Sequence, residues 1–204
     1  MKLNVYTIEH SITTLGPYKR FGLWVQGCHR NCPGCIARQS HQESDGRWID
    51  TGALSWEIIA AKEIEGLTIS GGEPFLQAPA LAELIRKVKA IRDVGIIIYT
   101  GFLLEELDAL PGGTDLLSLT DLLIDGPYVR ELDDGKSLRG SSNQRVHALT
   151  SRYASLLHLY GAEGRPTEEF LHSGTIHTVG IPNQASPHSD IENTNPSDRK
   201  DFEI

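Results

Sequence analysis

Three cysteines, Cys28, Cys32 and Cys35, lie on one short stretch of this 204-residue chain, with the spacing C-x₃-C-x₂-C. Three thiolates on one loop can hold three corners of a cubane iron–sulfur cluster and leave the fourth iron open. A cluster that only transfers electrons normally takes a fourth cysteine, and the sequence has none. The pattern therefore predicts an iron–sulfur site at which a further molecule binds the metal.

The same cysteines also fit a structural zinc site. Zinc would take the three thiolates and one histidine, with His29 or His41 as the fourth ligand. The chain would then be a zinc-binding module without catalysis. A disulfide framework is disfavoured, because the cysteines are odd in number and clustered rather than dispersed.

A glycine pair followed by a glutamate, Gly71-Gly72-Glu73, stands at the end of a predicted strand. Glycines let a ligand approach the backbone closely, and the glutamate offers a carboxylate to an ammonium group. Ligands of α/β proteins bind at the carboxyl ends of parallel strands. The cysteine loop also follows a predicted strand, so we expect both motifs at the same rim.

The elements that must position these motifs follow from the apolar pattern. Strands and helices alternate along the first two thirds of the chain, which is typical of an α/β fold with a parallel sheet. Strands are predicted at residues 2–8, 21–25, 67–69, 96–99 and 122–125, and helices at 54–64, 79–92 and 103–110. Beyond residue 132 the pattern weakens, with a possible hairpin at 167–181 and a polar tail at 182–204 that we expect to be disordered.

Composition excludes several other classes of protein. The net charge of −8 argues against a nucleic-acid-binding protein, which needs a basic face. No apolar run is long enough to span a membrane, and the first residues lack the pattern of a signal peptide. We therefore expect a cytoplasmic protein without nucleic-acid or membrane partners.

Together the two motifs resemble those of radical S-adenosylmethionine (SAM) enzymes. The resemblance implies a [4Fe–4S] cluster on Cys28, Cys32 and Cys35, whose open iron binds SAM. It implies that Gly71, Gly72 and Glu73 line the methionine part of SAM. Tyr99 and Thr100 end a strand and are candidates to line the adenosine site. The alternative is that Tyr99 is a buried tyrosine whose hydroxyl is satisfied within the protein. Asp125 ends another strand, where it would bind a hydroxyl group or cap the next turn.

Within that superfamily the chain is similar to the activating enzymes of anaerobic, class III ribonucleoside-triphosphate reductases. The shared stretches run from residue 20 to 146 and include the segments 99–102, 124–128 and 139–145. The implied reaction is reductive cleavage of SAM to a 5′-deoxyadenosyl radical, which abstracts hydrogen from a glycine of the reductase. The implied partners are that glycyl radical enzyme and a low-potential electron donor such as flavodoxin. No residue is singled out as catalytic.

About five strand–helix units are too few to close a full eight-fold barrel, so we expect an open, partial (β/α) barrel of the radical SAM type with an N-terminal strand pair at one edge. We expect a core at residues 1–146, an extension at 147–181 and the tail at 182–204. Related activating enzymes end soon after the core, and the extension favours an alternative: a radical SAM enzyme that modifies another peptide or a small molecule.

Overall fold

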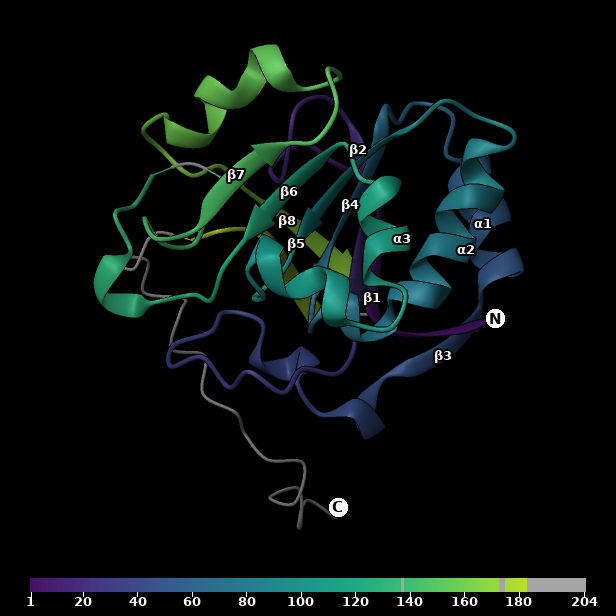
Figure 1. Ribbon diagram of the computed structural model, residues 1–204, viewed down its shortest axis with the longest axis horizontal. Coiled ribbons are helices and arrows are strands. Elements are labelled where there is room, and N and C mark those ends of the chain that lie inside the picture. Colours follow the sequence, from purple (N-terminus) through teal and green to yellow (C-terminus); the bar gives the residue numbers. More distant parts are fainter. Residues whose placement is uncertain (137, 173–174, 183–204) are drawn as a thin grey trace, which may run out of the picture.

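A seven-stranded sheet with the order β3-β1-β2-β4-β5-β6-β7 forms the centre of the computed structural model, which describes residues 1–136, 138–172 and 175–182. The helices α1, α2 and α3 cover one face of this sheet (Figure 1). The predicted α/β class is confirmed.

The strands are β1 (Lys2–Ile12), β2 (Arg20–Val25), β3 (Arg47–Asp50), β4 (Gly66–Gly71), β5 (Gly95–Tyr99), β6 (Leu122–Asp125), β7 (Arg145–Ala148), β8 (Thr167–His172) and β9 (Thr175–Gly180). The α-helices are α1 (Thr51–Ala60), α2 (Ala78–Lys89) and α3 (Gly113–Ser118), and the 3₁₀-helices are η1 (Arg38–Ser40), η2 (Glu43–Asp45), η3 (Pro74–Gln77), η4 (Leu104–Ala109), η5 (Arg130–Leu132) and η6 (Ala154–Gly161).

The four central strands β2, β4, β5 and β6 run parallel to one another. The sequence predicts this for β4, β5 and β6, whereas it places β2 in an edge pair with β1. In the structure β2 pairs antiparallel with β1 and also joins the parallel strands. Successive side chains of a strand point to opposite faces of the sheet. Leu23, Ile69 and Ile98 pack under the helices, whereas Trp24 and Tyr99 lie on the other face, here called the inner face. All four carboxyl ends therefore reach one rim, at which the cysteine loop and the Gly-Gly-Glu turn begin.

Residues at the N-terminal ends of α1 and α2 determine where these two helices begin. The Asp50 carboxylate accepts hydrogen bonds from the backbone N–H groups of Gly52 and Ala53, which caps α1 three residues earlier than the apolar pattern predicts. Pro79 stands in the first turn of α2, where its missing N–H costs nothing. Both helices also end earlier than predicted, and residues 104–109 form the 3₁₀-helix η4.

Two strands and one α-helix of the described residues were not predicted. β3 and β7 are the two edge strands, and each pairs antiparallel with its neighbour. β3 is short and largely exposed, so it carries little apolar signal. The helix α3 covers residues 113–118, to which the sequence assigned no element. The edge beside β2 is extended by β1 and β3 together.

The antiparallel pair β8–β9 lies against the inner face, behind β5 in Figure 1. Val179 and Ile181 pack there with Ile12 and Leu15. The predicted tail beyond residue 182 lies outside the described residues. In the part of the chain that the structure describes, no helix is long and apolar enough to cross a membrane.

Candidate metal centre

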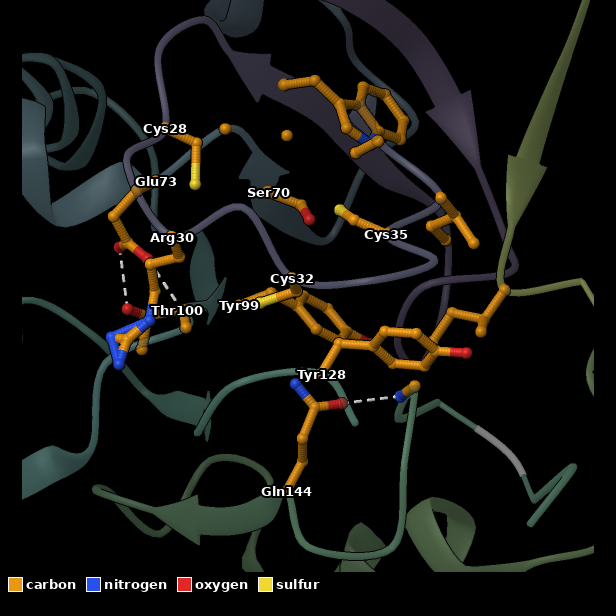
Figure 2. Close-up of a pocket in the computed structure, with 18 of the residues that line it drawn as sticks. Cys28, Arg30, Cys32, Cys35, Ser70, Glu73, Tyr99, Thr100, Tyr128 and Gln144 are labelled. Atoms are coloured by element: carbon orange, nitrogen blue, oxygen red, sulfur yellow. Dashed lines mark hydrogen bonds between the residues drawn. The ribbon is translucent and has the colours of Figure 1, made fainter. Parts of the chain in front are cut away.

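The three cysteines lie on the loop that follows β2, and all three line one cavity at the rim of the sheet. Figure 2 shows their sulfur atoms turned toward a common space, beside Ser70 at the end of β4. The loop is anchored where it starts, because Gly27 N donates to Ser40 O (2.7 Å) and Cys28 N donates to His41 O (3.0 Å).

Burial raises the pKa of the Cys28 and Cys35 thiols and so favours their protonated form when no metal is bound. A metal or cluster binds thiolates and must displace these protons. Among the residues that the structure describes, no three side chains of the metal-binding types stand close enough together to hold a single ion. The two histidines of the zinc alternative differ: His41 lines the cavity, whereas His29 is exposed and does not.

The Gly-Gly-Glu turn lies directly against the start of the cysteine loop. Gly72 N donates to Val25 O and Glu73 N donates to Gly27 O, each at 2.8 Å. A Cβ atom on Gly72 would stand 2.3 Å from the carbonyl oxygen of Gly27, and Gly71 has a φ of +100°. Both positions therefore need glycine for close backbone packing, and this packing brings the two motifs together.

Glu73 is buried at the base of the cavity and joins two strand ends. Its carboxylate accepts hydrogen bonds from Phe75 N (3.0 Å), Thr100 Oγ1 (2.7 Å) and Gly101 N (2.8 Å). Figure 2 shows the Thr100 bond and the Arg30 side chain beside it. Burial raises the pKa of Glu73, although these hydrogen bonds and the nearby guanidinium act in the opposite direction. A carboxylate accepts about four hydrogen bonds, so a ligand donor can still be added.

The cavity measures about 1020 Å³, including its part open to solvent. Its inner wall carries Trp24 and Tyr99. Tyr99 is partly buried, and its hydroxyl is satisfied because it donates to Leu138 O at 3.0 Å. Burial raises its pKa well above the ordinary value.

Gln144 is a cavity residue that the sequence analysis did not single out. Its Oε1 accepts from Gly140 N (2.7 Å), and its Nε2 donates to Gly126 O (2.9 Å), so it closes the loop that follows β6 beneath Tyr128 (Figure 2). The segment 139–145 contains this glutamine and carries the resemblance described above. That resemblance was the available signal, but it does not say which side chain points into the cavity.

Asp125 differs from the other candidate residues, because it does not line the cavity. Its fully buried carboxylate accepts from Leu104 N (2.7 Å) and from the Arg145 guanidinium, and His147 Nε2 lies 3.2 Å away. Burial by itself would raise the pKa of Asp125, but the hydrogen bonds outweigh it and hold the pKa below the usual value. The geometry gives Asp125 a structural role at the end of β6.

This arrangement predicts how Asp125→Asn changes stability with pH. The folded pKa lies below the unfolded value of about 3.9, so the ionised carboxylate stabilises the fold above about pH 4 and loses that contribution as the pH falls further. We expect the variant to be less stable by about 2 kcal/mol at neutral pH, with the difference shrinking in acid. Urea unfolding at several pH values measures this, with exposed Asp108→Asn as control. A constant difference at every pH would contradict the prediction.

The chain is similar to a known family and to several known proteins. A family model described as "4Fe-4S single cluster domain" matches residues 14–147. The chain is 33% identical over 143 residues to the anaerobic ribonucleoside-triphosphate reductase-activating protein of Escherichia coli K12, with 66% of this chain and 91% of that protein covered. The protein of the same name from Vibrio cholerae is 36% identical over 144 residues, with the same coverage. A pyruvate formate-lyase-activating enzyme from Staphylococcus epidermidis is 26% identical over 162 residues, covering 73% of this chain and 61% of that enzyme.

Proposed function

Because this chain belongs to the 4Fe-4S single cluster domain family and, within it, to the anaerobic ribonucleoside-triphosphate reductase-activating proteins, we propose that it generates a glycyl radical on an anaerobic ribonucleotide reductase. The chain is an enzyme of the radical SAM activase type, with a [4Fe–4S] cluster and SAM as its cofactors. The cluster supplies one electron when bound, which splits SAM into methionine and a 5′-deoxyadenosyl radical.

The proposal assigns the cluster to Cys28, Cys32 and Cys35. The observation that supports it most is that these three thiols, all partly buried, share one cavity with the Gly-Gly-Glu turn. The donor set fits the cluster, because soft thiolates are its ordinary ligands and three of them leave one iron open. The chain's task is to bind and orient the cofactors and to keep water from the reactive carbon.

The SAM site is proposed at the same rim. Gly71 and Gly72 offer a backbone surface without side chains, and Glu73 offers an acceptor to the ammonium group of SAM. Thr100 is assigned to the same site through its hydrogen bond to Glu73 (2.7 Å). Asp125 is proposed to act indirectly: its carboxylate accepts a hydrogen bond from Leu104 N and so holds the segment that follows β5.

Several finer features belong to the same proposal. The four parallel strands and their helices are interpreted as an open, partial (β/α) barrel of the radical SAM type, with a core at residues 1–146 and an extension at 147–181. The electron donor is proposed to be a low-potential protein such as flavodoxin. A cytoplasmic location is proposed because clustered free thiols persist in reducing compartments.

The proposed function is tested by detecting a glycyl radical on the partner reductase. The chain, loaded with iron and sulfide without air, is mixed with an anaerobic ribonucleoside-triphosphate reductase, SAM and a reductant. We expect electron paramagnetic resonance to show a carbon-centred glycyl radical, together with 5′-deoxyadenosine. Formation of 5′-deoxyadenosine without any glycyl radical would contradict the proposed substrate. A colourless protein that retains zinc and no iron would instead support the zinc-binding module.

A further inference from the structure

Residues 165–172 and 175–182, here called the C-terminal wall, lie beyond the part of the chain that the family model matches, yet they reach the candidate site. The matched region ends at residue 147. Gly180, Ile181 and Pro182 nevertheless line the same cavity as the three cysteines. In Figure 2 the yellow-green strand β9 passes along the side of the cavity on which Cys35 and Tyr128 lie.

A buried ion pair fixes the wall to the loop that follows β6. The Arg165 side chain is 1% exposed and pairs with Asp133, which is 5% exposed, at 2.7 Å. The same guanidinium donates to Lys136 O (2.9 Å), Arg139 O (2.8 Å) and Pro182 O (3.4 Å). A guanidinium removed from water needs such a complete set of partners. Arg165 therefore holds the end of the wall against the cavity.

A second anchor joins the wall to the turn between β1 and β2. The Glu168 carboxylate accepts from Thr13 N (2.8 Å), Thr13 Oγ1 (2.9 Å) and Thr14 Oγ1 (3.2 Å). Val179 and Ile181, 5% and 9% exposed, pack onto the inner face. With two polar anchors and an apolar contact, the wall is an integral part of this fold.

The wall adds an apolar side chain to the cavity. The inner face of the cavity presents Leu15, Trp24, Tyr99 and Ile181, which are large apolar or aromatic side chains. The helices cover the opposite face of the sheet, so this inner side is where a substrate has to approach the cysteines. Ile181 and Leu15 therefore occupy part of the cavity that the three cysteines also line.

We propose that the C-terminal wall sets substrate selectivity: with Ile181 and Leu15 it admits an extended peptide whose reacting residue is glycine and excludes one with a bulky side chain. This inference rests on the proposed function and adds to it the residues that select the substrate. In the reaction, the Cα–H bond of the peptide breaks and a C5′–H bond forms. The products are 5′-deoxyadenosine and a peptide carbon radical, and the electron that cleaved SAM comes from the added reductant.

The test uses the full chain loaded with its cluster, with dithionite and SAM. Three synthetic peptides differ only in their central residue, which is glycine, alanine or phenylalanine deuterated at Cα. Deuterium in 5′-deoxyadenosine reports abstraction, and fluorescence anisotropy of labelled peptides reports binding. The variants are Ile181→Ala and Arg165→Met. The control is Ile176→Ala, on the strand β9 that leads to Ile181, with a side chain that is 62% exposed to solvent.

We expect the wild type and Ile176→Ala to prefer the glycine peptide over the phenylalanine peptide, in both abstraction and binding. Ile181→Ala should lower this preference by at least about tenfold, because the removed carbons open space in an apolar pocket. Arg165→Met should also lower the preference for the glycine peptide, because Arg165 holds the end of the wall against the cavity. An unchanged preference in Ile181→Ala, or no abstraction from any peptide while SAM is still cleaved, would overturn this inference. Failure of the wild type to cleave SAM at all would instead contradict the proposed function.

Discussion

Replacing Cys32 with alanine is expected to abolish iron binding and to lower 5′-deoxyadenosine formation by at least about 100-fold. The reason is the ligand count: the chain has three cysteines in all, and all three line the cavity. A loop that loses one of three thiols has no fourth cysteine to replace it. Iron content, visible absorption and anaerobic product formation measure the effect.

The matched control for this prediction is His29→Ala. His29 stands on the same loop, between two of the proposed ligands, but it is exposed and does not line the cavity. We expect its iron content and product formation to match the wild type. A Cys32→Ala chain that keeps both would contradict the assigned ligand set, and a loss in His29→Ala equal to that in Cys32→Ala would favour a histidine ligand.

Glu73→Ala is expected to have the second largest effect, on stability and activity together. The substitution leaves Phe75 N, Gly101 N and the Thr100 hydroxyl without the carboxylate that they share. Each buried donor left unsatisfied costs about 1–3 kcal/mol, so we expect a loss of at least about 3 kcal/mol. Urea unfolding measures the stability. Product formation should fall to background, since the β4 and β5 ends lose their common anchor.

Glu73→Gln removes the negative charge of the side chain but keeps its size and shape. It keeps one acceptor oxygen, but its amide N–H₂ faces a donor, so we expect a smaller loss of about 1–2 kcal/mol. If the carboxylate also binds the SAM ammonium, product formation should fall at least about tenfold while the folded protein still holds its iron. Glu63→Gln is the control, because Glu63 is a surface residue whose carboxylate pairs with Lys19. Wild-type activity in Glu73→Gln would contradict a role in SAM binding.

The centre of the fold was predictable because its strands are buried on both faces. Apolar runs such as residues 67–69 and 96–98 mark parallel strands without any tertiary information. The edge strands were not predictable for the opposite reason. β7 is only partly buried, and its place is fixed by the pairing of Arg145 with Asp125, which no local pattern encodes.

The residues of the candidate site also fall into those that local sequence predicts and those that it does not. Cysteine spacing and the Gly-Gly-Glu turn are local signals, and the structure brings both to one cavity. The cavity residues Gln144 and Ile181 depend on distant segments folding back over the rim. Arg165 is the clearest case: its partner Asp133 is 32 positions away in the chain, and only the fold brings the two charges together.

Anaerobic reconstitution of the wild-type chain with iron and sulfide, followed by reduction in the presence of SAM, tests the central claim most directly. The account predicts a brown protein with about four irons per chain that converts SAM to 5′-deoxyadenosine and methionine. A chain that binds no iron but retains zinc tightly, and leaves SAM intact, would contradict it.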